Sequence, residues 1–197
     1  MKESIGILKS EHRSMSAVLL GLKHLAEIAQ DPKVKPEFAV FRSMLRYIDE
    51  YPERLHHPKE DEHLFACLVR RSAESKDLIG KLKAEHLHGA KLIRELERRL
   101  MLFEEQWPQG AAEFLGAVDA YADFHWKHMR KEETELLPLA ERHLTEEDWR
   151  AIDAAFAHSR DPIAGIEERD FQKLFSRIAN LAPAPVGLGD AWKRATN

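Results

Sequence analysis

Two histidine–glutamate pairs in this chain have the same spacing. His56 precedes Glu60 by four residues, and His128 precedes Glu132 by four residues. Residues four apart lie on one face of an α-helix, so each pair presents an imidazole and a carboxylate side by side. Together these two groups bind iron and similar divalent ions. One such pair arises easily by chance, whereas two aligned copies predict a metal site.

Two further histidines, His12 and His86, occupy a repeated position. Residues 8–12 read Leu-Lys-Ser-Glu-His, and residues 82–86 read Leu-Lys-Ala-Glu-His. The two segments that hold the histidine–glutamate pairs also align without a gap. This internal repeat predicts two helical hairpins of similar plan.

Helices are needed to position these side chains, and the sequence predicts them. Helix formers dominate, and the apolar residues recur at intervals of three and four, whereas strand signals are weak. Pro52 and Pro58 lie inside the second of the long helices and predict a kink or an irregular turn there. The four long helices are expected over residues 4–30, 36–71, 76–103 and 111–143.

The pattern changes after the fourth long helix. Thr145 followed by Asp148 is an acidic variant of the capping box and predicts a helix over residues 146–158. A sixth helix is expected over residues 167–181, followed by an extended Pro/Gly-rich tail over residues 182–189.

The hairpin plan predicts that the four histidines lie at one level. Antiparallel neighbours place residues at equal height when both are equally far from the link between them. His12 and His86 each lie 21 residues before the centre of the next interhelical link. This places His12 within about one turn of His56, and it places His86 level with His128.

The helical faces predict that this layer is buried. His12 lies on the apolar side of the first helix, and His86 lies on that of the third. A buried polar group without a partner costs about 2–7 kcal/mol. Four imidazoles and two carboxylates therefore require compensation, which a metal centre supplies. Carboxylates on different helices can each bridge two ions, as in the di-iron sites of helix bundles.

At this point the sequence resembles the hemerythrin-like, HHE cation-binding family over residues 4–143. The family motif is a histidine, an HxxxE, a second histidine and a second HxxxE. The matching residues are His12, His56, Glu60, His86, His128 and Glu132. The resemblance implies an all-α fold, an up-down antiparallel four-helix bundle, to which this chain adds one or two short C-terminal helices. We expect residues 1–144 to form the bundle, and residues 145–197 to form a helical extension and tail that pack on it.

The resemblance also implies a non-haem di-iron centre, with Glu60 and Glu132 as bridges. Zinc or manganese can substitute, because histidine–glutamate sites accept these ions too. Oxygen-carrying hemerythrins look as if they use five histidines, two of them four apart on the third helix. The residue four after His86 is Ala90. In ligand count the chain is more similar to the iron-centre-repair and stress-response branch.

Other residues could complete or replace parts of this set. His125 is the first candidate for an extra ligand and His63 the second, while Tyr121 could donate a hydrogen bond from behind the ligands. His57 and Asp61 form a rival pair with the same spacing, although the repeat favours His56 and Glu60. Glu133 lies five residues after His128, which is the spacing of the last carboxylate in the pattern of the oxygen-carrying hemerythrins. We expect His88 to face solvent and Cys67 to be a small buried residue.

Composition excludes several classes of function. The chain has 197 residues and a net charge of −4, so it lacks the basic excess of a nucleic-acid binder. It has no apolar run of about 18 residues, which excludes a membrane-spanning helix. A single cysteine cannot form an internal disulfide, and the first residues lack an apolar signal-peptide core. We expect a soluble cytoplasmic protein.

The leading functional hypothesis is a di-iron protein that binds or senses O₂ or NO, or that handles reactive oxygen or nitrogen species. Its partner would be that small diatomic ligand or peroxide. The alternatives are iron handling or iron–sulfur-cluster repair, a redox enzyme that reduces peroxide or NO, and a structural bundle with an opportunistic zinc ion. The helix around residues 149–156 either covers the bundle or offers a homodimer surface.

Overall fold

The computed structural model describes residues 2–158 and 176–192. Within these ranges the chain is all-helical, as predicted, and contains no strand, only isolated bridge residues such as Pro183 and Gly189. The first and third long helices are α1 (Glu3–Ile28) and α5 (Lys76–Gln106). The second long helical segment comprises α2 (Phe38–Ile48), η1 (Asp49–His56), α3 (His57–Lys59), η2 (Glu60–Phe65) and α4 (Ala66–Arg71). The fourth comprises α6 (Ala111–Lys131), η4 (Glu132–Leu136) and α7 (Leu137–His143), and the shorter elements are η3 (Ala73–Ser75) and α8 (Glu146–His158).

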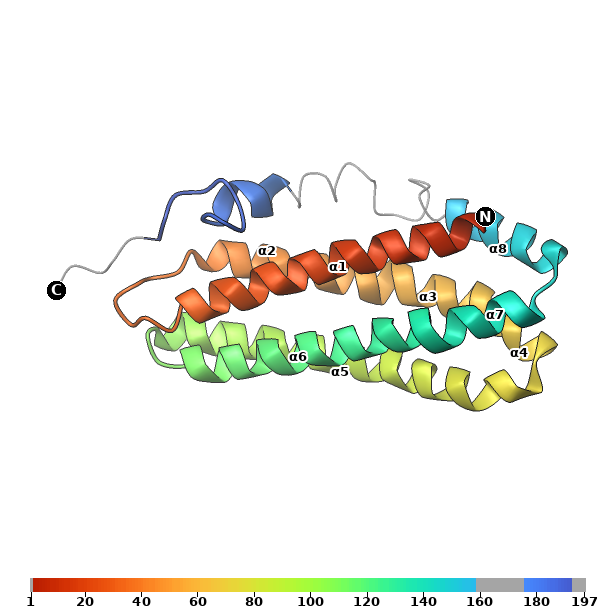
Figure 1. Ribbon diagram of the computed structural model, residues 1–197. Helices are drawn as coiled ribbons and strands as arrows, with labels where there is room; N and C mark the ends of the chain where they lie inside the picture. The colour runs from red at the N-terminus through yellow and green to blue at the C-terminus, as the bar shows by residue number, and fades with distance from the viewer. Residues whose placement is uncertain (1, 159–175, 193–197) are drawn as a thin grey trace.

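The long helical segments lie side by side (Figure 1). α1 packs against α2 and α6, and α5 packs against the same two helices, so the segments enclose a common interior. The links over residues 29–37 and 107–110 lie at one end of the molecule, and the link at η3 lies at the other (Figure 1). The helices predicted over 4–30, 36–71, 76–103 and 111–143 are therefore confirmed, with small shifts at their ends.

Three stretches of π-helix interrupt the second and fourth segments. η1 contains Pro52, which confirms the irregular turn predicted at the prolines. The interruption η4 was not predicted, and it directly precedes α7, in whose first turn Pro138 lies. Proline lacks the N–H that an α-helix requires, and a local π-turn accommodates the carbonyl left without that donor. Glu60 begins η2 and Glu132 begins η4, so both predicted bridging carboxylates stand at such a transition.

Apolar side chains gather in two separate clusters. One cluster is built around residues of α1, α2, α5 and α6 and includes Leu22, Phe41 and Phe103. The other lies towards the opposite end and includes Leu8 and Phe65. The layer that contains the four predicted histidines falls between the two clusters. Within the described ranges, no helix is both long and apolar enough to cross a membrane.

Helix α8 covers the end of the molecule near the N-terminus and contacts α1 (Figure 1). Trp149, Ile152 and Phe156 are buried in the second apolar cluster, so these side chains do not form the exposed dimer surface that was the alternative. The predicted capping box is present. The Thr145 backbone N–H donates to Asp148 Oδ2 at 2.9 Å, and the Asp148 N–H donates to Thr145 Oγ1 at 3.2 Å.

The C-terminal part of the chain differs from its prediction. Residues 176–181 are helical, whereas the rest of the helix predicted over 167–181 lies outside the described residues. The tail expected to be extended is compact, because backbone hydrogen bonds fold residues 182–189 back on themselves, such as Gly189 N–H to the Ala182 carbonyl at 2.9 Å. This turn rests on α1, since a Cβ at Gly21 would lie 3.0 Å from Val186 Cγ1.

Candidate metal centre

The six predicted ligand residues meet in one buried layer. None of them is more than 6% exposed. Their donor atoms form two groups, and within each group the atoms lie within 4.8 Å of one another. Glu60 and Glu132 belong to both groups. The first group adds His12 and His56, and the second adds His86 and His128.

Each shared carboxylate directs one oxygen to each group. Glu60 Oε1 lies 3.5 Å from His56 Nε2, while its Oε2 lies 3.5 Å from His86 Nε2. Glu132 Oε2 lies 3.2 Å from His12 Nε2, while its Oε1 lies 3.2 Å from His128 Nε2. Carboxylates that bridge two ions need this division of their oxygens. The arrangement therefore has room for a pair of cations, with two imidazoles on each.

The inward-facing atoms fit bound cations because the protein leaves them unpaired. The Nε2 atoms of the four histidines and both oxygens of each glutamate are buried, and they have no hydrogen-bond partner among the described residues. Unpaired buried polar atoms are rare and costly in native proteins. Eight in one layer call for a partner that accepts several lone pairs at once. A divalent cation is such a partner, and imidazole with carboxylate suits iron, manganese or zinc.

The outward-facing nitrogens of the same histidines contact a second ring of carboxylates. His56 Nδ1 donates to Glu11 at 2.7 Å, and His12 and His128 donate to Glu133 and Glu85, each at 2.9 Å. His86 Nδ1 lies 3.2 Å from Asp61 Oδ1. Metal-binding histidines usually donate their other N–H to a carboxylate, which fixes the ring and the tautomer. Hydrogen bonds therefore leave Nε2 as the free ligand atom on His12, His56 and His128, and the contact with Asp61 favours the same tautomer of His86.

Two lysines support this outer ring. Lys59 Nζ donates to Glu11 at 2.7 Å, and Lys131 donates to Glu85. Burial alone would raise the pKa of Glu11, but His56 and Lys59 outweigh it and lower the pKa to about 2. The sequence did carry a signal for these residues, because a glutamate directly precedes both His12 and His86 in the repeat. What it could not show is that Glu11 and Glu85 reach across to the next helix.

The inner carboxylates repel one another. Burial, and then the charge of Glu132, raise the pKa of Glu60 well above its ordinary value. Burial also opposes the charged form of His86, but contacts with Asp61 and Glu132 raise its pKa to about 9. Without a cation, Glu60 and His86 therefore favour bound protons. Metal binding at such a site releases these protons, because the ligands must be deprotonated.

The two candidates for an extra ligand lie outside both groups. His63 is exposed, as is His88, which was expected to face solvent. His125 is buried, but its Nε2 lies 3.8 Å from Glu53 Oε1 rather than among the inner donors. Burial, and then nearby histidines, lower the pKa of His125 to about 3. Tyr121 donates to Glu53 at 3.3 Å, so it reaches the site only from behind.

The rival pair divides into two different environments. Asp61 stands in the outer ring beside His86 and belongs to neither group. His57 is buried, at 4% exposure, and joins His86 and His128 in a third group of donor atoms within 4.8 Å of one another. Sequence reasoning treated His57 as an alternative to His56, whereas the structure places both imidazoles at the centre.

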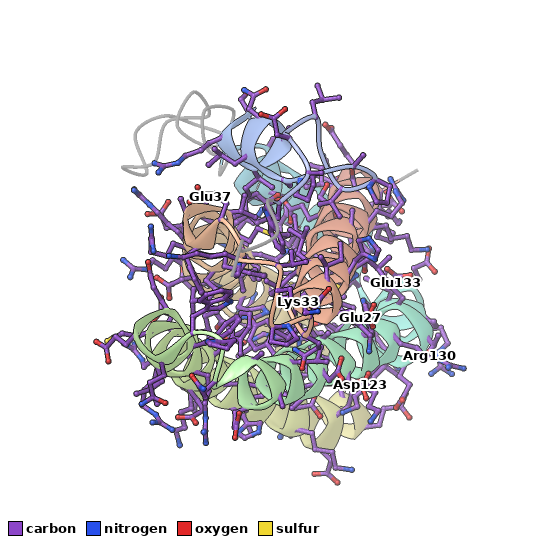
Figure 2. The ribbon with its side chains drawn as sticks, turned by 90° about the vertical axis from the view of Figure 1, so that its left-hand side faces the viewer. Glu27, Lys33, Glu37, Asp123, Arg130 and Glu133 are labelled. Atoms are coloured by element: carbon purple, nitrogen blue, oxygen red, sulfur yellow. The ribbon has the colours of Figure 1, made fainter. Side chains whose placement is uncertain are left out.

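A groove of about 420 Å³ reaches the layer between α1 and the fourth long segment. His12, Met129 and Glu133 lie along it, together with Trp126 and Arg130. Figure 2 shows Arg130 and Glu133 on the outer edge of their segment, beside α1. A small molecule could therefore approach the first group from this side, where Glu133 forms the outer contact of His12.

Comparison with known proteins agrees with this geometry. A search of curated proteins finds no matching relative. The family model described as the hemerythrin HHE cation binding domain matches residues 3–140, which is most of the chain. The His/Glu groups fit the metal binding of that family. On this evidence, the chain belongs to the hemerythrin HHE cation-binding domain family.

Proposed function

We propose that this protein holds two non-haem iron ions between Glu60 and Glu132 and binds or senses O₂ or NO, or handles reactive oxygen or nitrogen species. The observation that carries the proposal is that two donor groups share both carboxylates. We further propose that the fold is the up-down antiparallel four-helix bundle of hemerythrins. A single cysteine suits the cytoplasm, the location that we propose.

When bound, iron would supply a coordination position and redox chemistry. The chain's own residues do the rest. Four imidazoles are held by outer carboxylates, two apolar clusters flank the layer and exclude water, and the groove beside His12 admits a small ligand. Glu133 and Arg130 make the mouth of the groove polar, so we expect water at the entrance and its exclusion from the buried layer.

Anaerobic loading of the metal-free protein with Fe(II) tests the proposal. We expect two ions per chain by elemental analysis, and a new visible absorption band on exposure to O₂ or NO. The variants Glu60→Gln and Glu132→Gln should lose this response, whereas His88→Gln, at an exposed position, should keep it. A wild-type protein that holds fewer than two ions, or whose absorption spectrum changes with neither gas, would contradict the proposal.

The same samples separate the alternative functions. Sustained consumption of peroxide or NO would identify a redox enzyme, and rapid transfer of iron to an acceptor would identify iron handling or cluster repair. Stoichiometric binding without turnover or transfer would identify a sensor or carrier. Zinc or manganese found in protein purified without added metal would replace iron in the proposal.

A further inference from the structure

The two halves of the centre are equivalent at nearly every position. Segment 56–61 aligns with segment 128–133, and His12 aligns with His86. The inner glutamates, the lysines and the outer carboxylates all have counterparts in this alignment. The exceptions are His57, whose counterpart is Met129, and Pro58, whose counterpart is Arg130. One half therefore carries an imidazole where the other carries a thioether.

The ring of His57 lies against the second donor group. It stacks on the ring of His86 with centroids 4.1 Å apart and planes 10° apart, and it meets His128 edge-on at 5.6 Å. One nitrogen of His57 lies within 4.8 Å of donor atoms of both residues. Two imidazole nitrogens bound to one ion at about 2.1 Å lie at most about 4.2 Å apart, so small side-chain shifts would let the three rings share an ion.

Like His86, His57 has a carboxylate near its Nδ1. Its Nδ1 lies 3.3 Å from Glu53 Oε2, and Tyr121 donates to the other oxygen of Glu53 at 3.3 Å. The Glu53 side chain is 7% exposed. Gly89 makes room for it, because a Cβ there would lie 3.1 Å from Glu53 Oε1. The carboxylate thus orients His57 as Asp61 orients His86.

We propose that His57 is a fifth imidazole ligand, on the ion held by His86 and His128. The proposal rests on the proposed di-metal centre and deepens it. It makes the two ions inequivalent: three imidazoles surround one, and two surround the other. In this chain the second helical segment supplies the imidazole that the third helix, with Ala90, does not.

Zinc-loaded wild-type protein with ¹⁵N-labelled histidine gives a direct test that does not depend on a variant. Zinc is diamagnetic and accepts the same donors. We expect the nitrogen resonances of five histidines, His57 among them, to move to metal-bound positions, while those of buried His125 do not. If only the four predicted histidines respond, the inference fails and the di-metal centre stands. If fewer than two zinc ions bind, or none of the histidines responds, the proposed function fails first.

The variant His57→Met gives the matched test, because it repeats the residue of the other half. In iron-loaded wild-type protein, Mössbauer spectra should contain two quadrupole doublets of equal area, and in His57→Met they should converge. The variant should lose one ion to a competing chelator at no more than about one tenth of the chelator concentration that the wild type requires. His88→Met, at an exposed position, is the control and should behave like the wild type. A single quadrupole doublet in the wild type, or unchanged chelator resistance in a folded His57→Met, would overturn the proposal.

Discussion

At the residue scale, each ligand imidazole works together with a carboxylate behind it. Glu11 on α1 contacts His56 of the neighbouring second segment, and Glu85 on α5 contacts His128 of the neighbouring fourth segment. Such supports hold the ring in the tautomer and direction that a metal needs. Their loss should therefore weaken binding without removing any donor.

We expect Glu11→Gln and Glu85→Gln each to lower metal affinity by about 10–100-fold. Each changes the support of one ion, because Glu11 contacts His56 and Glu85 contacts His128. Titration with a competing chelator measures the effect. Glu27→Gln, at an exposed position of α1, is the control and should leave affinity unchanged. Wild-type affinity in both outer variants would show that these contacts do not orient the ligands.

Glu60 should stabilise the loaded protein and destabilise the metal-free one. The pKa of Glu60 is raised well above its ordinary value by burial and by the charge of Glu132, so ionised Glu60 opposes folding at neutral pH without a cation. Glu60→Gln should therefore raise the unfolding free energy of metal-free protein, by about 1–3 kcal/mol, and abolish the gain on metal addition. Denaturant unfolding with and without metal checks both effects. A metal-free variant less stable than metal-free wild type would refute the first.

The six candidate ligands could be identified from sequence because of the repeat. Equal distances from the links place His12 near His56 and His86 level with His128, whatever the details of packing. The role of His57 was not predictable in this way. It depends on how η1 rotates the ring towards His86, and the spacing alone made His57 only a rival of its neighbour.

At the element scale, the long helices follow from apolar periodicity, but the π-turns follow from geometry that periodicity does not encode. A proline near the start of α7 looks in sequence like an ordinary first-turn proline. This proline continues a helical segment instead of starting one, and for that reason it requires a wider turn at η4. Because Glu60 and Glu132 stand at such turns, the turns set the direction of both carboxylates.

The N-terminus of α8 gives a prediction of pH dependence. The hydrogen bond from Arg71 holds the pKa of Asp148 well below its ordinary value of 3.8, with help from Thr145. A group whose pKa is lowered by folding stabilises the fold above its unfolded pKa and loses this effect as the pH falls. Asp148→Asn should cost about 1 kcal/mol at pH 7 and progressively less below about pH 4. Unfolding curves of both proteins across this range test it, and a difference that does not depend on pH would contradict it.

At the scale of the whole molecule, a polar layer separates two apolar clusters. Each cluster can pack by itself, whereas the layer between them is costly unless its atoms are paired. The sequence predicted this layout in outline, since the histidines lie on apolar faces. The compact tail over residues 182–189 was not predictable, because its turn depends on long-range packing against α1 and on its own backbone hydrogen bonds.

Removal of the metal should therefore lower stability. A ligand present at about 100 times its dissociation constant adds about 2.7 kcal/mol, and for a chain of this size each kcal/mol shifts Tm by about 2–4 °C. We expect chelation to lower Tm by at least about 5 °C. Calorimetry before and after chelation measures this shift. The double variant Glu60→Gln, Glu132→Gln is the control, since its Tm should not respond to metal.

The division of ligands between the hairpins has one more consequence. Each hairpin supplies the two imidazoles of one donor group but only one of the two carboxylates that the groups share. Neither half is thus a complete chelator, and a chain severed at the η3 link would recover the centre only when both fragments reassociate. In such a split protein, the added cation would stabilise the association of the two complementary fragments.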